Sequence, residues 1–345
     1  MAFSEIMEKK FNHKESRHIC SAEKPNGYLF FSLEDYRNNY FCSDDPNKII
    51  EFYNGFENRD QLIQWMRERP KGVANIHEVE GDKEIIVVIP TADFNGKYAK
   101  ECRENLFNGL QMIFVESGEV PDPYFNIAHN LNVGIKKAME YNPKWVVFSG
   151  DDMIKVDPIS KLISELRKMN NRDTDVVFTA PSQYHSTQMF LGKPNHFFSL
   201  SIGILRFFLK RFSHIQKTYY QLRRFNKQLF FPRYEHGPTL PYKIVNFIFF
   251  KRIEPFVNIL SFGIFSSNLI RKSNESLFDE NYINEMEDTD LSIRIKHAMY
   301  NTSVVDFKIN EYIGSSFGNG GTRTLRVLPG WTYFSYKIEN RDFDK

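Results

Sequence analysis

Cysteine is scarce in this chain of 345 residues, which contains Cys20, Cys42 and Cys102. Three widely spaced cysteines match neither a zinc-binding spacing nor a disulfide framework, so they favour a reducing compartment. Long apolar runs are lacking too, since no uncharged stretch reaches the length of about 18 residues that indicates a transmembrane helix. The N-terminus has no apolar segment of the kind found in secretory signals. These absences predict a cytoplasmic protein.

Acidic residues are almost missing from one part of the chain. Residues 197–252 contain 11 Lys and Arg and 15 aromatic residues but a single acid, Glu235, which gives a local net charge of +10. The whole chain has a net charge of only +2, with 41% hydrophobic and 26% charged residues. That composition is typical of a folded protein. The segment 197–252 therefore differs in kind from its surroundings.

Strand and helix patterns alternate through the middle of the sequence. β-branched or apolar runs at 85–89, 111–115, 145–148 and 175–179 predict strands, and the stretches 98–110, 127–141 and 158–169 predict helices. This alternation predicts an α/β fold with a mostly parallel sheet flanked by helices. We expect four parts: an N-terminal extension (1–80) with a helix around 60–66, two halves of the α/β domain (81–190 and 256–345), and a basic aromatic insert (191–255).

Polar and acidic side chains follow the predicted strands, where ligands bind in parallel sheets. They are Thr91, Asp93, Glu116, Asp151 and Asp152. Asp151 and Asp152 come directly after an apolar strand and Gly150. A divalent metal that carries phosphates would stabilise two like charges at this position, because Mg²⁺ and Mn²⁺ prefer carboxylate oxygens. The alternative is an ordinary turn, in which Asp is common.

A second acidic cluster, 285–290, precedes Leu291 and Arg294. One interpretation is a solvated helix N-terminus, where acids interact favourably with the helix dipole. The other is a catalytic base.

The order of these motifs resembles the family 2 inverting glycosyltransferases of GT-A fold. The resemblance rests on Pro90-Thr91, Glu116-Ser117-Gly118, Asn132-Val133-Gly134, Asp151-Asp152 before Pro158, Phe278-Asp279-Glu280, and the run from Glu287 to Arg294. It covers residues 84 to about 190 and about 255 to 300. Glu116 stands where the family more often has Asp, and Ser149 where its metal motif often begins with Asp.

This resemblance implies transfer of a sugar from a nucleotide-sugar to an acceptor hydroxyl on a glycan or a lipid-linked molecule, with inversion at the anomeric carbon. Asp151 and Asp152 would hold Mn²⁺ or Mg²⁺. Asp288 would act as the general base, and Glu287 would orient it. The donor would contact Pro90, Thr91, Asp93, Glu116, Asn132 and Asp151. Asp290 and Arg294, one helical turn apart, would form a structural pair.

The segment 197–252 fits three interpretations. The first is an interfacial membrane element, because the segment has apolar runs with cationic flanks. The second is a nucleic-acid surface, in which basic residues contact phosphates and aromatic rings stack on bases. The third is the core of an insert. We favour peripheral contact with the cytosolic face of a membrane and expect no nucleic-acid partner, because lipid-linked acceptors are common in the family.

Two other functions compete with the glycosyltransferase. Gly150-Asp151-Asp152 also resembles the metal motif of viral RNA polymerases, but the chain is short for a polymerase and lacks a matching upstream aspartate strand. Nucleotidyl transfer is disfavoured, because the sequence has no Gly-rich signature after the first predicted strand. The remaining alternative is an inactive, membrane-binding module on a transferase scaffold.

Overall fold

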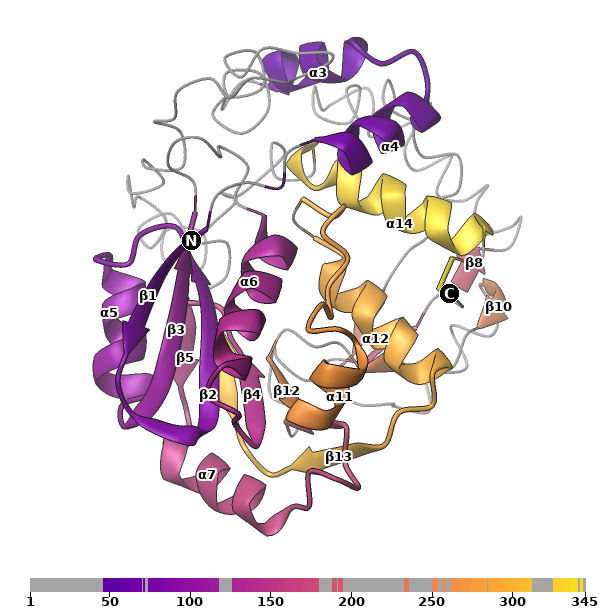
Figure 1. The fold of residues 1–345 in the computed structure, drawn as a ribbon. Helices are drawn as coiled ribbons and strands as arrows, with labels where there is room; N and C mark the ends of the chain where they lie inside the picture. Colours follow the sequence, from indigo (N-terminus) through magenta and orange to yellow (C-terminus); the bar gives the residue numbers. More distant parts are fainter. Residues whose placement is uncertain are drawn as a thin grey trace, which may run out of the picture.

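The computed structural model describes residues 46–69, 71, 74–117, 126–179, 188–190, 192–194, 233–235, 250–253, 257–258, 262–283, 285–311, 325–340 and 342–343. Over these residues the chain forms an α/β fold, in which helices flank a seven-stranded sheet (Figure 1). The order of its strands is β1-β3-β2-β4-β12-β6-β13. The α/β class predicted from the sequence is confirmed.

The first half of the sheet follows the predicted alternation of strands and helices. The described elements of this part of the chain are β1 (Asn75–Val79), β2 (Asp82–Thr91), α5 (Lys97–Glu101), the π-helix η2 (Cys102–Leu106), β3 (Leu110–Glu116), α6 (Ile127–Met139), β4 (Trp145–Phe148), β5 (Met153–Lys155), α7 (Ile159–Lys168) and β6 (Val176–Thr179). Of these strands, β5 lies outside the seven-stranded sheet. β3 and β4 both pair in parallel with β2. β2 is buried from Ile85 onward because its apolar side chains meet neighbours on both faces.

The sheet as a whole is mixed, so the expectation of a mostly parallel sheet is wrong. Three of its six strand pairings are antiparallel. β12 (Gly263–Ser266) inserts antiparallel between β4 and β6, with Gly263 beside Phe148. The chain therefore enters β12 at the carboxyl end of β4. The outer strand β13 (Thr302–Val305) is again parallel to β6.

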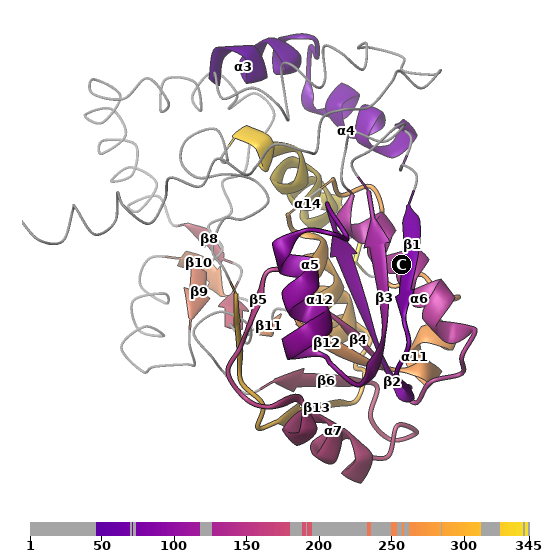
Figure 2. The ribbon, with the colours of Figure 1, turned by 90° about the vertical axis from the view of Figure 1, so that its left-hand side faces the viewer.

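Two hydrophobic clusters cover the two faces of the sheet. Residues of α5, η2 and α7 pack on one face, and residues of α6, α11 (Ser267–Lys272) and α12 (Glu287–His297) pack on the other. Figures 1 and 2 show α5 and α6 on opposite sides of β2 and β3. α6 approaches the sheet closely, since a Cβ on Gly134 would lie 2.3 Å from Cγ1 of Val88. Gly134 therefore serves packing.

A third cluster joins the two ends of the described chain. It contains buried side chains of α3 (Pro46–Asn54), α4 (Arg59–Glu68) and α14 (Leu328–Asn340), together with Tyr282 and Met286. The helix predicted around 60–66 is confirmed as α4. Residues 46–69 thus share a core with the C-terminal segment, and the division of the chain into four parts stays a prediction.

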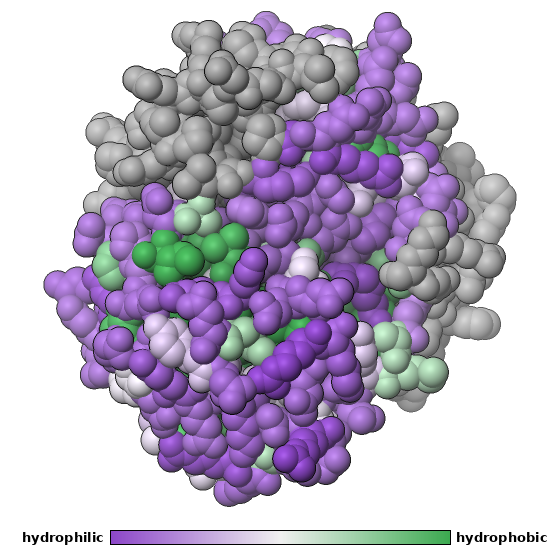
Figure 3. Space-filling model, viewed as in Figure 1, coloured by the Kyte–Doolittle hydropathy of each residue, from purple (hydrophilic) through white to green (hydrophobic). Residues whose placement is uncertain are grey.

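The remaining strands are short: β7 (Gln188–Phe190), β8 (Gly192–Pro194), β9 (Arg233–Glu235), β10 (Phe250–Ile253), β11 (Val257–Asn258) and β14 (Ile309–Glu311). Most of the basic aromatic segment, and with it the predicted membrane contact, lies outside the described residues. Among the helices that the structure describes, none is long and apolar enough to cross a membrane. The face seen in Figure 3 is mostly hydrophilic, with small separate apolar areas.

Candidate functional site

The turn after β4 carries the adjacent carboxylates of Asp151 and Asp152. β4 consists of four buried apolar residues and ends at Phe148, so the chain leaves the sheet at its carboxyl edge. The absence of a side chain at Gly150 makes room for this turn, because a Cβ there would lie 2.8 Å from Oδ1 of Asp152. The carboxylate of Asp152 folds back over Gly150, and Asp152 is 8% exposed.

Asp151 is held by groups from two other elements. Oγ1 of Thr91, at the end of β2, donates a hydrogen bond of 2.7 Å to Oδ2 of Asp151. Sγ of Cys102, in η2, donates to the main-chain oxygen of Asp151 over 3.2 Å. Burial and the negative charge of Asp152 raise the pKa of Asp151 to about 7. Within the described part of the chain, Asp151 forms no ion pair with Lys, Arg or His.

Further residues of the predicted site lie at the same edge of the sheet. Pro90 and Thr91 end β2, beside Val115 and Glu116 of β3. Asp93 is exposed in the next loop, and its charge contributes to the raised pKa of Asp151. The fold therefore brings together strand ends that lie about 60 residues apart in the sequence.

Glu116 lies at this edge as well, but both of its carboxylate oxygens contact the protein. Oε2 is 2.7 Å from Nε2 of His77 on β1, and Oε1 accepts a hydrogen bond of 2.8 Å from the main-chain N–H of Phe94. The rings of His77 and Phe94 stack, with 4.3 Å between their centroids. Glu116 thus fixes the loop after β2 to β1 and β3, and this geometry favours a structural role over contact with a nucleobase.

The π-helix η2 contacts both loops of this edge. Its Cys102 reaches the Asp151 turn, and its Arg103 donates a hydrogen bond to the main-chain oxygen of Phe94. The guanidinium of Arg103 also lies 4.2 Å from the centroid of the Phe94 ring. Isolated π turns occur frequently at functional sites. Here the π turn presents two successive side chains to the two loops.

Asn132 on α6 is turned toward a different segment. Its Oδ1 accepts hydrogen bonds from the main-chain N–H groups of Leu277 and Phe278, and its Nδ2 donates to the main-chain oxygen of Phe278 and to Oε1 of Glu280. The residue is 5% exposed. These contacts use both ends of the amide, so Asn132 clamps α6 to the 277–280 segment instead of facing the strand-end carboxylates.

The second acidic cluster begins at a strained turn. Glu285 and Met286, just before α12, have φ angles of 81° and 76°. Left-handed backbone at such non-glycine residues costs about 1–3 kcal/mol each and persists only where the surroundings enforce it. Strain of this kind is common at active sites.

The two carboxyls that follow have different contacts. Asp288 is half-exposed, and its Oδ1 accepts hydrogen bonds from the main-chain N–H and the hydroxyl of Thr289 over 2.6 and 3.2 Å. Glu287 is buried, and its Oε2 has no hydrogen-bond partner among the described residues. Burial raises the pKa of both carboxyls, and the charge of Asp288 raises that of Glu287 further. The hydrogen bonds described for the Asp288 carboxylate come from Thr289, and the orienting role that the resemblance implies for Glu287 stays a prediction.

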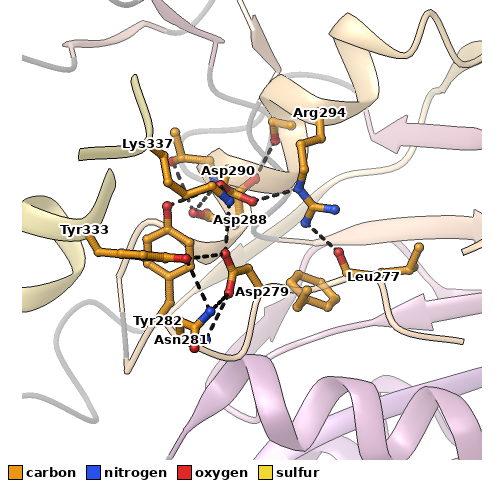
Figure 4. Close-up of polar contacts among 12 residues, drawn as sticks. Leu277, Asp279, Asn281, Tyr282, Asp288, Asp290, Arg294, Tyr333 and Lys337 are labelled. Atoms are coloured by element: carbon orange, nitrogen blue, oxygen red, sulfur yellow. Dashed lines mark hydrogen bonds and ion pairs between the residues drawn. The ribbon is translucent and has the colours of Figure 1, made fainter. Parts of the chain in front are cut away.

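Behind this turn, two deeper carboxylates are neutralised by cations (Figure 4). Asp290 is fully buried, and Nε of Arg294 lies 2.8 Å from its Oδ2, which confirms the predicted helix pair. Nζ of Lys337, on α14, lies 2.6 Å from Oδ1 of Asp290 and 3.0 Å from Oδ2 of Asp279. The hydroxyl of Tyr333 also donates to Asp279. The ammonium of Lys337 holds the pKa of Asp279 below its ordinary value despite burial.

Phe148 connects the two acidic clusters. It is the last residue of β4, three positions before Asp151, and its ring meets the ring of Phe278 edge-on at 5.3 Å. Leu291 of α12 belongs to the same hydrophobic cluster. The segment with the second acidic cluster is thus anchored near the carboxyl end of β4.

The first cluster has the chemistry of a partial metal site. Carboxylate oxygens are hard donors that suit Mg²⁺ and Mn²⁺, and the raised pKa of Asp151 reflects two buried like charges that a cation would stabilise. Among the described residues, no three His, Cys, Asp or Glu side chains form a metal-binding group by themselves. Mg²⁺ commonly takes one or two protein carboxylates, and substrate phosphates and water complete its coordination. Asp151 and Asp152 fit that arrangement.

Sequence reasoning missed three residues of these sites: His77, Cys102 and Lys337. His77 lies on an edge strand, and Cys102 is one of three scattered cysteines, so neither belongs to a motif. Lys337 stands 47 residues after Asp290, on a helix that the sequence analysis did not predict. The sequence signal for Lys337 was a lysine among apolar residues near the C-terminus, and this pattern alone does not predict its partners.

No family model matches this sequence, and no curated protein matches it. The structure alone defines the fold class of the protein, which is an α/β fold with a mixed seven-stranded sheet, compatible with a Rossmann-like arrangement.

Proposed function

We propose that this protein is a metal-dependent inverting glycosyltransferase of GT-A type, which moves a sugar from a nucleotide-sugar donor to an acceptor hydroxyl. The observation that carries the proposal is the pair Asp151-Asp152 at the carboxyl edge of β4, where like charges crowd and Asp151 has no described counter-cation. A nucleoside diphosphate that arrives with Mn²⁺ or Mg²⁺ supplies both the positive charge and the remaining ligands.

Each residue of this edge has a role in the proposal. Asp151 and Asp152 would hold the metal, which when bound would supply Lewis-acid stabilisation of the charge on the departing diphosphate. Thr91 keeps the carboxylate of Asp151 in place through its 2.7 Å hydrogen bond. Pro90 and Asp93 flank the nucleoside, because they lie on the end of β2 and in the loop that follows.

Asp288 is the proposed general base, which accepts the proton of the acceptor hydroxyl. It is the accessible carboxylate of the first turn of α12, since Asp290 is fully buried and neutralised by Arg294 and Lys337. A raised pKa brings a carboxyl closer to working pH, where a base is most effective. Lipid-linked or glycan acceptors and a peripheral membrane contact through 197–252 remain part of the proposal.

The test is nucleotide release from a panel of UDP-, GDP- and dTDP-sugars, with Mn²⁺ or EDTA. We expect one nucleotide to be released only with metal, and Asp151→Asn to reduce the rate at least about 10²-fold. Asp157→Asn is the matched control, because Asp157 lies in the same region but is paired with Lys161 over 3.0 Å. Silence of the wild type across the panel, together with metal-dependent incorporation of nucleotides on an RNA template, would replace the proposal with the polymerase alternative.

A further inference from the structure

A buried ammonium on helix α14, that of Lys337, reaches the first turn of α12 next to the strained acidic turn. Lys337 contacts Asp290 over 2.6 Å and Asp279 over 3.0 Å, and its side chain is 7% exposed. Asp290 belongs to the first turn of α12, two positions after Asp288. Its main-chain N–H donates a hydrogen bond of 2.8 Å to the oxygen of Met286, the second left-handed residue. Lys337 therefore acts on the segment that carries the proposed base.

Aromatic rings surround the ammonium and keep water from it. The centroids of Tyr333, Tyr282 and Phe343 lie 5.7, 5.8 and 5.2 Å from Nζ. The hydroxyl of Tyr282 donates to Asp290 over 3.2 Å, on the same oxygen that Lys337 contacts. Because the ammonium is enclosed by acceptors and rings, its position is fixed, and a fixed charge fixes the carboxylates on either side of it.

The two carboxylates differ in what else neutralises them. Asp290 has a second cation, Arg294, while Asp279 has Lys337 as its one ion-pair partner among the described residues. Arg294 comes from α12 itself, so its pair with Asp290 cannot tie the helix to another element. It does contact the main-chain oxygen of Leu277. Among the ion pairs of the described residues, the pair of Lys337 with Asp290 links the first turn of α12 to α14, which α4 in turn supports.

We propose that Lys337 is a positioning residue: its contact with Asp290 and Asp279 holds the left-handed turn at Glu285 and Met286, and thereby keeps Asp288 where it accepts a proton. The catalytic part of this inference rests on the proposed function. The positional part does not, because it concerns only how α14 holds the start of α12. Lys337 itself touches no reacting atom.

The first test compares Lys337→Met with Lys337→Arg and with the double variant Lys337→Met/Asp279→Asn. The double variant guards against misfolding, because it removes the carboxylate that would lose its cation and leaves Asp290 paired with Arg294. Glu339→Gln is the matched control. Glu339 lies on the same helix and pairs with Arg59 over 2.7 Å, so it ties α14 to α4, and among the described residues it has no ion pair with α12.

Hydrogen–deuterium exchange over residues 285–292 measures the positional part without any substrate. We expect exchange in this segment to rise at least about tenfold in Lys337→Met and in the double variant, to rise less in Lys337→Arg, and to stay at the wild-type level in Glu339→Gln. Unchanged exchange in the folded double variant overturns the inference.

Nucleotide release measures the catalytic part, with the panel sugar nucleotide that the wild type hydrolyses fastest. We expect kcat to fall about 10²-fold in Lys337→Met, with the donor KM changed less than about threefold and partial recovery in Lys337→Arg. An active wild type with an unchanged kcat in Lys337→Met overturns the inference alone. A wild type that hydrolyses no panel compound overturns the proposed function and, with it, the catalytic role of Lys337.

Discussion

Two pairs of carboxylates in this molecule, Asp279 with Asp290 and Asp151 with Asp152, differ in how their negative charge is neutralised. Behind α12, Asp279 and Asp290 are matched by Lys337 and Arg294 at distances of 2.6–3.0 Å. At the end of β4, Asp151 has a hydroxyl and a thiol as neighbours and no described cation, and its pKa is raised to about 7. A neutralised carboxylate builds the fold, and one that is left unneutralised is available to a ligand.

Asp288 occupies an intermediate position, since it is half-buried and its carboxylate accepts hydrogen bonds from Thr289. If unneutralised carboxylates carry the chemistry, Asp288→Asn should lower kcat of sugar transfer by ~10²–10⁴-fold while donor KM changes little. Initial rates with and without acceptor measure this. Asp60→Asn is the matched control, because Asp60 is likewise the second residue of a helix, α4. An equal loss in both variants would contradict the role of Asp288.

Asp290 tests the other side of the comparison. Asp290→Asn leaves Lys337 and Arg294 short of a buried counter-charge, so we expect a loss of about 3–5 kcal/mol in the free energy of unfolding. Urea denaturation measures it. Asp306→Asn provides the contrast, because Asp306 pairs with Lys161 over 3.1 Å at the surface, with its side chain 74% exposed, and should cost less than about 1 kcal/mol. Equal losses of stability in the two variants would contradict the structural role assigned to the buried, neutralised Asp290.

Substitution of Asp151 should change stability in the opposite direction from substitution of Asp290. Its ordinary pKa is about 4, and burial with Asp152 raises it to about 7, so the folded protein binds more protons than the unfolded chain between these values. The Asp151 contribution is therefore absent at low pH, and it lowers stability progressively as the pH rises from about 4 to about 7. Asp151→Asn removes this loss and should be the more stable protein above about pH 7.

Urea denaturation in EDTA across this pH range checks that prediction, and Mn²⁺ sharpens it. Metal at millimolar concentration should stabilise the wild type and have little effect on Asp151→Asn, because the cation takes the place of the missing counter-charge. If the two proteins have parallel pH profiles in EDTA, the carboxylates at this turn are not crowded in the way the structure indicates.

Glu116 should give the smallest effect. Glu116→Gln keeps an acceptor for the N–H of Phe94 and loses only the charge opposite His77, so we expect a stability loss below about 1 kcal/mol and less than about a threefold change in donor KM. A large rise in KM for a single nucleobase would contradict the structural role and restore the predicted contact with the base.

Much of the fold follows from local patterns in the sequence. The runs 85–89 and 145–148 are apolar without interruption, which is typical of strands buried on both faces, and both are strands here. β12 was missed because its four residues, Gly263–Ser266, carry no periodic signal, and a strand this short gains its identity from the neighbours it pairs with. The prediction of a mostly parallel sheet is wrong at β12 and also at β1, which pairs antiparallel with β3.

The candidate site, too, could be predicted only in part from the sequence. Asp151, Asp152 and Thr91 could be grouped in advance, because parallel strands bring their carboxyl ends to one edge. Asn132 and Glu116 lie near that edge too, yet their polar atoms are used by the protein. Nothing in the sequence states which side chain a carboxylate or amide contacts, because partners up to 148 residues away decide it.

The sequence by itself determined the α/β class, the strand ends and the residue types at them, because hydrophobic periodicity and turn chemistry act over a few neighbouring residues. Only the tertiary structure decided which charges are neutralised. That depends on the approach of a lysine from the far end of the chain, and on the burial that makes an unmatched carboxylate costly.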